Sequence, residues 1–422
     1  MHAIGRQPNP AIRAPDGAPL HYERHRPERT TLYRLVQQHA ASFIAHTEAS
    51  TGGELPRFVK DEFDAFLECG ILAHGFLRLR CGECGHDKLL AFSCKRRGFC
   101  PSCGARRMSQ TAAHLDGVYR CGADGAPSFV EVAAPTDDEL HALLQTIITR
   151  LMKMLTRRGV LVEDMGQTYL AEPDADSEEA RTLRTLQAAA ITYRIAFGPR
   201  AGQKMLTLRG TMPRQGTARQ PLCADIDGFS LHAAVRVEAH DRKRLEQLCR
   251  YITRPALSDE RVQLNAAGQV ELKLKTPWRD GTTHLVMSPL EFMQRLAALV
   301  PRPRLHLIRF HGVLAPNAKL RSLVVPQGPL EQDEPTSEAA AAAECELAAA
   351  QARPHRISWA RLLKRVFGID MQHCPNCGAG ELKIIAAILE RPVIEKILTH
   401  LGLDPQPPPR GRSRELGQDF AA

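Results

Sequence analysis

Two closely spaced pairs of cysteines constrain this chain more than any other feature of its sequence. Cys81 and Cys84 form one Cys-x-x-Cys pair, and Cys100 and Cys103 form a second pair shortly after it. Two such pairs can place four thiolates at the corners of a tetrahedron, which is the geometry of a structural zinc site. Four protein ligands leave no open coordination position, so we expect this zinc ion to stabilise the fold and to take no part in chemistry.

The sequence leaves other roles for these cysteines open. The chain has 12 cysteines, and its first residues lack the apolar core of a secretory signal, so we expect a cytoplasmic protein with metal ligands rather than disulfides. A set of buried free cysteines is the alternative. Four nearby residues could replace a zinc ligand or build a second site: Cys69, His74, His86 and Cys94.

A third pair, Cys374 and Cys377, lies near the C-terminus without an obvious partner pair. Half of a zinc site and a redox-inert turn explain it about equally well. His355, His373 or Cys345 could supply the missing ligands.

The charge balance is basic, with 56 Lys and Arg against 47 Asp and Glu and a formal net charge of +9. Such a balance favours a polyanionic partner, although solubilising surface charge is the alternative. Basic residues gather around the second cysteine pair beside Phe92 and Phe99, where they could contact nucleic-acid phosphates: Lys95, Arg96, Arg97, Arg106 and Arg107. No apolar run approaches the ~20 residues of a membrane span.

Hydrophobic periodicity predicts a mixture of helices and strands. We expect helices over residues 28–68 and 137–159, a strand over 228–239, a helix in 241–254 stopped by Pro255, and a hairpin over 262–278 with Gly268 in its turn. Residues 326–355 are rich in Ala, Glu and Pro and are interpreted as a linker, and the Pro- and Arg-rich tail is expected to be disordered.

The segment "RCGECGHDKLLAFSCKRRGFCPSCGARRM" resembles the zinc-binding domain that begins the insertion sequence 91 (rolling-circle) transposases. The resemblance continues through "DGFSLHAAVRVEA", "LEQLCRYITRPAL" and the C-terminal "HCPNCGAGELKIIAAI". It implies a transposase of the His-hydrophobe-His tyrosine nuclease superfamily, with DNA as its partner, in the bacterial cytoplasm at the nucleoid.

The same resemblance implies a catalytic role for Tyr251, whose hydroxyl would attack a phosphodiester of single-stranded transposon-end DNA and form a 5′-phosphotyrosine link. Arg254, about one turn further on, could hold a phosphate oxygen. Gln247 stands where two-tyrosine relatives carry their other tyrosine. The family uses Mg²⁺ or Mn²⁺, which two histidines one residue apart on a strand would bind.

That histidine pair is missing. The chain has 17 histidines, and no two of them are separated by a single residue. His232 and His306 lie in strand-like stretches, and we interpret both as core or fold-supporting residues. In relatives, a segment like "LDGVYR" ends a strand, and a long region separates it from the zinc ribbon. In this chain the segment directly follows the helix after the ribbon. An internal in-frame deletion between His114 and Asp116 is the simplest explanation.

The expected fold is therefore α+β: a helical N-terminus, a zinc ribbon, an incomplete antiparallel-sheet α/β nuclease core and a small C-terminal zinc-ribbon-like segment. The expected units are 1–68, 69–115, 116–325, the linker 326–355 and 356–422. Two functions stay open: a DNA transposase with impaired strand cleavage, and a catalytically dead zinc-dependent protein that competes for transposon ends.

Overall fold

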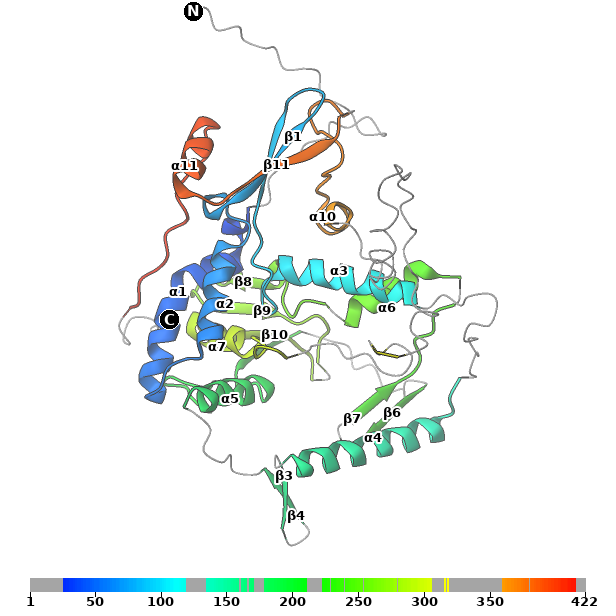
Figure 1. Ribbon diagram of the computed structural model, residues 1–422. Coiled ribbons are helices and arrows are strands. Elements are labelled where there is room, and N and C mark those ends of the chain that lie inside the picture. Colours follow the sequence, from blue (N-terminus) through cyan, green and yellow to red (C-terminus); the bar gives the residue numbers. More distant parts are fainter. Residues whose placement is uncertain are drawn as a thin grey trace, which may run out of the picture.

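The computed structural model describes residues 26–118, 134–158, 161–164, 167–170, 178–210, 222–227, 229–238, 240–252, 254–278, 280–305, 315, 317–318, 359–378 and 380–414. These residues form helices and small antiparallel sheets, as the sequence predicts at the level of fold class (Figure 1). The expected linker over 326–355, together with Cys345, His355 and His306, lies outside the described residues. None of the described helices is both long enough and apolar enough to span a bilayer.

The N-terminal part is a pair of helices, α1 (Thr31–Thr51) and α2 (Arg57–Glu68), preceded by the 3-10 turn Pro27–Arg29. The Thr30 side chain caps α1 by accepting from the Tyr33 amide, and Gly52 ends the helix with a positive φ of 71°. The apolar faces of both helices are buried in the main core of the molecule. The expected helical segment 28–68 is thus confirmed, with Pro56 separating its two helices.

A three-stranded sheet follows these helices and combines both ends of the chain. It has the order β11-β1-β2, with β1 (Phe76–Cys81), β2 (Asp87–Ala91) and β11 (Leu382–Ile388). Strand β1 is central and pairs antiparallel with both neighbours. The short turn η2 (Leu72–His74) leads into β1. The C-terminal segment is therefore part of the ribbon sheet, which corrects the expectation of a separate unit over 356–422.

The rest of the C-terminal segment packs against the same region. Helix α11 (Arg391–His400) buries Ile394 and Leu398 against Leu72 and Phe76. Its continuation runs along α1 and α2, where the Gly411 amide donates to the Gln37 carbonyl at 2.8 Å. Arg410 forms ion pairs with Asp64 and Glu68 of α2. The expectation of a disordered tail is wrong for residues up to 414, because these contacts hold the tail on the N-terminal helices.

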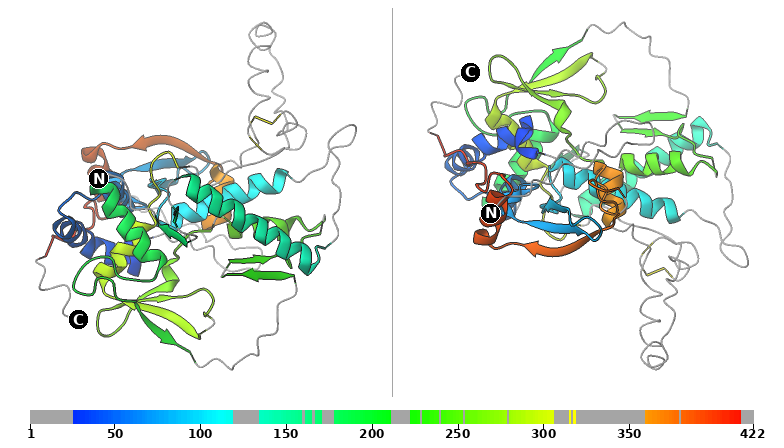
Figure 2. Two further views of the ribbon diagram at one scale, coloured as in Figure 1. Left: turned by 90° about the horizontal axis from the view of Figure 1, so that it is seen from below. Right: turned by 90° about the horizontal axis from the view of Figure 1, so that it is seen from above.

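The middle of the chain contains a four-stranded sheet of order β5-β10-β9-β8. Its strands are β5 (Leu206–Arg209), β8 (Val262–Leu264), β9 (Val270–Lys273) and β10 (Thr282–Met287). Helices α5 (Glu178–Ile191) and α7 (Pro289–Ala298) pack on one another and on α1, so the sheet and the N-terminal helices share one core (Figures 1 and 2). The hairpin β8–β9 is confirmed, and Gly268 in its turn has a φ of +76°.

Four further helices and two short hairpins complete the described part. Helix α4 (Asp137–Arg157) packs on the hairpin β6 (Cys223–Ile226) and β7 (Phe229–His232) around a small cluster of its own. The hairpin β3 (Leu161–Asp164) and β4 (Gln167–Leu170) follows α4. Helix α3 (Pro101–Val118) lies beside α6 (Arg242–Ile252), and α10 (Trp359–Phe367) contacts α3 (Figure 1). The 3-10 turn η3 (Asp259–Arg261) precedes β8.

The observed helices and strands agree with some local expectations and differ from others. The helices over 137–159 and before Pro255 are confirmed as α4 and α6, whereas the strand over 228–239 is limited to β7. His232 is exposed at the end of β7, so its interpretation as a core residue is wrong. The residues of "LDGV" belong to the last turn of α3 and form no strand end, because helix α3 continues through Val118.

Candidate metal centres and the tyrosine site

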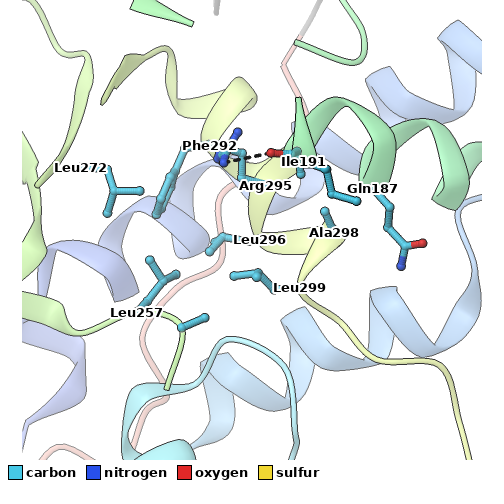
Figure 3. A pocket seen from close by; sticks show the side chains of 11 residues that line it. Gln187, Ile191, Leu257, Leu272, Phe292, Arg295, Leu296, Ala298 and Leu299 are labelled. Atoms are coloured by element: carbon cyan, nitrogen blue, oxygen red, sulfur yellow. Dashed lines mark hydrogen bonds between the residues drawn. The ribbon is translucent and has the colours of Figure 1, made fainter. Parts of the chain in front are cut away.

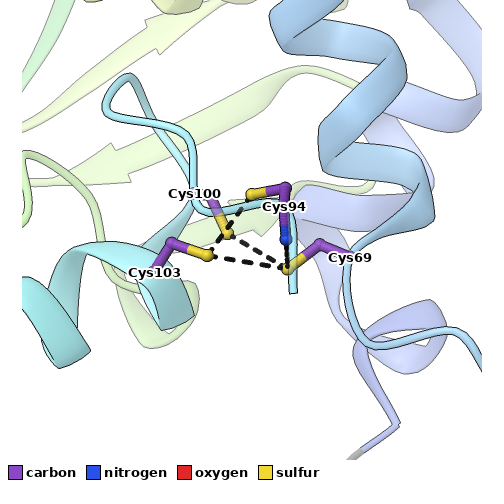
Figure 4. Close-up of side chains that lie close together, drawn as sticks. All are labelled: Cys69, Cys94, Cys100 and Cys103. Atoms are coloured by element: carbon purple, nitrogen blue, oxygen red, sulfur yellow. Dashed lines mark hydrogen bonds between the residues drawn. The ribbon is translucent and has the colours of Figure 1, made fainter. Parts of the chain in front are cut away.

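Four thiols meet where the ribbon joins the N-terminal helices. We call this group the base cluster: Cys69, Cys94, Cys100 and Cys103 (Figure 4). Cys69 ends α2, Cys94 follows β2, and the other two lie at the start of α3. The Sγ of Cys69 lies 3.8 Å from that of Cys103 and 3.8 Å from that of Cys100, and Cys94 Sγ lies 3.3 Å from Cys103 Sγ. Hydrogen bonds from the neighbouring thiols, Cys100 first, lower the pKa of Cys103.

A second group of four thiols lies at the far end of the β1–β2 hairpin. This tip cluster contains Cys81, Cys84, Cys374 and Cys377. The Sγ atoms of Cys81 and Cys377 are 3.7 Å apart, and those of Cys84 and Cys374 are 3.6 Å apart. The Asn376 amide donates to Cys84 Sγ at 3.5 Å and lowers the pKa of that thiol to about 6, whereas burial raises the pKa of Cys374 to about 12.

The thiol groups of both clusters suit a tetrahedral zinc ion. A Zn–S bond of about 2.3 Å places two sulfurs of a tetrahedron about 3.8 Å apart. The sulfur separations of 3.3 to 3.8 Å agree with that edge and exceed the disulfide length of about 2.05 Å. Thiolates are the ligands that zinc prefers, and four of them leave no position for water or substrate. Such ions would stabilise the fold and would take no part in a reaction.

The expected pairing of Cys81 and Cys84 with Cys100 and Cys103 is wrong. The first pair lies at the tip of the hairpin and the second at its base, with strand β1 between them. From Phe76 to Cys81 this strand extends over roughly 17 Å at about 3.3 Å per residue, which no single metal ion can bridge. Cys69 and Cys94, whose roles the sequence leaves open, both belong to the base cluster.

The histidines considered as ligands lie outside both clusters. His74 and His86 belong to neither the base cluster nor the tip cluster. His373 is exposed, and its Nδ1 lies 3.1 Å from a carboxylate oxygen of Asp370. Asp370 in turn accepts from backbone amides that lead into the third cysteine pair, so His373 supports the turn rather than a metal.

The five basic residues expected to contact DNA separate into two kinds. Lys95 and Arg96 are exposed. Arg97 donates to the carbonyl of Leu305, Arg106 donates to Ser93 Oγ at 2.9 Å, and Arg107 donates to the carbonyl of Arg96. The last three guanidinium groups therefore also hold the loop between β2 and α3 in place.

Phe99 is not available for a nucleic-acid surface. It is only 1% exposed and packs against Phe63 and Phe66, with ring centroids 5.0 and 5.2 Å away. The expectation that Phe99 accompanies the basic residues on a contact face is wrong, because the ring belongs to the core below the base cluster.

Tyr251 lies near the C-terminal end of α6 and is 56% exposed. The guanidinium carbon of Arg254 and the Nζ of Lys275 each lie 4.4 Å from the centroid of its ring. Cations at this distance from an aromatic ring are attracted by its π-electrons and keep the ring oriented. Sequence reasoning found Arg254 but missed Lys275, which lies just after β9 and carries no local signal of its contact with α6.

The base cluster and the tyrosine helix are connected by a close contact between α3 and the residues after α6. A Cβ added at Gly104, next to Cys103, would lie 2.9 Å from Cβ and from Cγ of Pro255. Real carbon atoms do not approach so closely, so only glycine fits here. A metal ion bound at the base cluster would therefore fix the start of α3, which lies against Pro255.

A cavity lies between α5, α7 and the segment that follows α6. It measures about 480 Å³ and is lined mainly by apolar residues of α5 and α7, with Ala256 and Leu257 at one wall (Figure 3). Its charged residue, Arg295, donates to the Ala190 carbonyl at 3.3 Å and lies 5.2 Å from the Tyr193 ring. Since that guanidinium already has partners, we interpret the cavity as a gap in packing and not as a ligand site.

Two family models match adjacent parts of the chain. The model described as "Transposase zinc-binding domain" matches residues 35–118, which contain the base cluster and the first half of the tip cluster. The model described as "Putative transposase" matches residues 117–321, which contain Tyr251. The chain belongs to the insertion sequence 91 transposase family.

The two transposase models meet at residues 117–118, in the last turn of α3. The zinc-binding domain of this transposase is thus followed at once by its second domain, and the second half of the tip cluster lies outside both matched ranges. No curated protein and no solved structure matches the chain significantly.

Proposed function

We propose that this transposase binds single-stranded transposon-end DNA at a site around Tyr251 and that its strand cleavage is impaired. The observation that carries the proposal is the exposed ring of Tyr251 between two cations, Arg254 and Lys275. Two positive charges beside an exposed phenol suit a phosphodiester, whose oxygens an arginine and a lysine can hold by charge-assisted hydrogen bonds.

The chemistry follows from the family resemblance. In a complete centre the tyrosine oxygen attacks phosphorus, the bond from phosphorus to the 3′ oxygen breaks, and the strand ends as a 5′-phosphotyrosine and a free 3′-OH. Arg254 and Lys275 would orient the phosphate and neutralise charge on its oxygens. Neither residue can accept the phenolic proton, since both are cations at neutral pH.

The missing histidine pair is the reason to expect impaired cleavage. The family binds Mg²⁺ or Mn²⁺ through imidazoles, and none of the 17 histidines has the required spacing. The two cations 4.4 Å from the ring of Tyr251 would also repel a divalent ion at that place. The residues present therefore do not fit the metal, and we propose DNA binding without efficient nicking.

The DNA-binding face extends from the tyrosine to the ribbon. Helix α3 begins at the second cysteine pair and lies beside α6 (Figure 1). The loop before α3 contains Lys95 and Arg96, so we include these two residues in the proposed face. Phosphate contacts of this kind supply affinity with little sequence preference. Such a protein would compete with an intact transposase for transposon ends.

The test is a binding and nicking assay with single-stranded transposon-end DNA. We expect Lys275→Ala and Arg254→Ala each to weaken binding and to reduce the salt dependence by about one phosphate contact. Lys396→Ala on α11 removes the same charge from an exposed position elsewhere and should leave binding unchanged.

Nicking is measured with the same DNA in Mg²⁺ or Mn²⁺. We expect no covalent protein–DNA adduct with the wild-type chain or with Tyr251→Phe. An adduct formed by the wild-type chain and lost in Tyr251→Phe would show that cleavage is intact. Equal binding by Lys275→Ala, Arg254→Ala and the wild-type chain would refute the phosphate site.

A further inference from the structure

Three short segments of the chain have the same knuckle structure. Each contains Cys-x-x-Cys-Gly, and in each the glycine amide donates to the carbonyl of the first cysteine: Gly85 to Cys81 at 3.1 Å, Gly104 to Cys100 at 3.0 Å and Gly378 to Cys374 at 2.8 Å. This bond folds the loop so that both sulfurs point the same way, as a zinc knuckle requires.

The glycines separate the three knuckles into two types. Gly85 and Gly378 have positive φ values of 67° and 71°, so their chains turn away after the second cysteine. Gly104 instead continues into helix α3. The two knuckles of the first type face each other in the tip cluster, whereas the helical one joins Cys69 and Cys94 in the base cluster.

We propose that the tip cluster is a second zinc site, built by Cys81 and Cys84 of the ribbon together with Cys374 and Cys377 from the C-terminal segment, and that this ion clamps the two ends of the chain together. The family zinc-binding model ends at residue 118 and so contains only half of these ligands. The other half comes from a part of the chain that follows the transposase match.

Further contacts around the tip cluster hold the ribbon and the C-terminal segment together. The Gly82 amide donates to the Glu381 carbonyl at 3.4 Å, and the Gly380 amide points to Cys377 Sγ at 3.4 Å. A Cβ added at Gly380 would collide with Cys81 Sγ. Lys88, buried on β2, donates to the Asp370 carbonyl at 2.7 Å and holds the segment before the third cysteine pair.

The described residues make few apolar contacts near the tip cluster, so the proposed ion would contribute much of the stability there. Among the described residues, six buried side chains form the core around it, and two of them are proposed metal ligands themselves: Leu79, Cys81, Leu363, Met371, Cys374 and Leu382. A small core of this kind gives limited stability, and metal ligation is the usual supplement. Loss of the ion should therefore loosen the pairing of β11 with β1 while the base cluster and its larger core persist.

The experiment measures zinc per full-length chain by elemental analysis after removal of loosely bound metal. We expect two zinc ions in the wild-type chain and one in each of two double variants, Cys374→Ser with Cys377→Ser and Cys94→Ser with Cys100→Ser. Cys223→Ser, at a half-buried cysteine of β6 outside both clusters, serves as the control and should keep two ions.

Two outcomes would overturn the second site. The first is a single zinc ion in the wild-type chain that is lost in two double variants: Cys81→Ser with Cys84→Ser, and Cys100→Ser with Cys103→Ser. That result would mean that these two cysteine pairs share one ion. The second is a Cys374→Ser, Cys377→Ser variant that retains two ions. Neither outcome depends on DNA binding or nicking, so the clamp and the proposed function are tested separately.

A second variant covers the case in which the serine substitutions prevent folding. Cys377→His keeps a metal ligand, so the cobalt-loaded chain should still bind two ions, with the sulfur-to-cobalt absorption weakened by one thiolate. An absorption spectrum identical to that of the wild-type chain would show that Cys377 is not a ligand. Gly380→Ala should lower the zinc affinity of the tip cluster alone, because the added carbon displaces Cys81 Sγ.

Discussion

Replacing Gly104 by alanine tests the contact that joins the ribbon to the tyrosine helix. The added Cβ would lie 2.9 Å from two ring carbons of Pro255 and 3.5 Å from its Cα. The proline ring is bonded to the backbone at both ends and cannot rotate away. Relief therefore requires a shift of α3 relative to the residues after α6.

Two opposed contributions decide whether Gly104→Ala raises or lowers the free energy of unfolding. Glycine to alanine inside a helix stabilises by about 1 kcal/mol, because alanine loses less backbone entropy on folding. Overpacking at a rigid contact costs about 1–3 kcal/mol. With both carbons well inside the usual separation of about 3.5–4.0 Å, we expect a net loss of about 1 kcal/mol for Gly104→Ala and about 3 kcal/mol for Gly104→Val.

The measurement is urea unfolding of the zinc-loaded chain, followed by circular dichroism. Gln110, exposed on the same helix, provides the matched control. There, Gln110→Ala should be more stable than Gln110→Gly by about 1 kcal/mol, since only helix propensity changes. The alanine-minus-glycine difference at position 104 should have the opposite sign.

The same stabilisation at both positions would refute the close contact between α3 and Pro255. The ribbon and the Tyr251 region would then not pack against each other at this position, and the base cluster would not affect the position of the tyrosine through this contact. A change in the denaturant slope at position 104 alone would indicate that the two parts no longer unfold together.

Three further predictions concern the N-terminal core and the tail. Phe99→Ala should cost about 3–5 kcal/mol, because the ring is 1% exposed between two other aromatic rings; thermal melting with zinc present measures the loss. Tyr33 donates to the Leu67 carbonyl at 3.0 Å, and burial raises its pKa to about 12 from 10.0. The neutral phenol of Tyr33 stabilises the fold fully below pH 10, and this contribution should disappear as the pH rises from about 10 to about 12. The unfolding midpoints of the wild-type chain and of Tyr33→Phe should therefore converge over that range. Arg410→Gln should cost less than about 1 kcal/mol, decreasing at high salt, because its ion pairs with α2 are exposed; a loss that is independent of salt would contradict this.

The sequence predicts the elements whose pattern is local. The helices α1, α2, α4 and α6 and the hairpin β8–β9 follow from periodicity, capping residues and the turn at Gly268. The zinc knuckles also follow from local spacing, because two cysteines three positions apart present their sulfurs together in a short turn. Strand β7 is shorter than its alternating pattern suggests, since an exposed alternating stretch gains little from pairing.

The pairing of the knuckles could not be predicted from spacing. A Cys-x-x-Cys pair needs a second pair of ligands, but nothing in the pair itself says which part of the chain supplies it. Nearness along the sequence favoured Cys100 and Cys103 as partners of Cys81 and Cys84, whereas the length of strand β1 separates them. The glycine after each pair does not sort the knuckles in the sequence, because all three pairs carry it and only its backbone conformation differs between the two types.

What the sequence alone determined is the chemistry: the thiol ligands, the basic residues, the tyrosine and the absence of a histidine pair, because side-chain identity is complete in the sequence. The tertiary structure decided which of these groups meet. Antiparallel pairing of β11 with β1 brings Cys374 and Cys377 to Cys81 and Cys84, and the chain after β9 brings Lys275 to Tyr251. Both contacts join residues distant in the chain, and such contacts arise from packing of whole elements rather than from local preference.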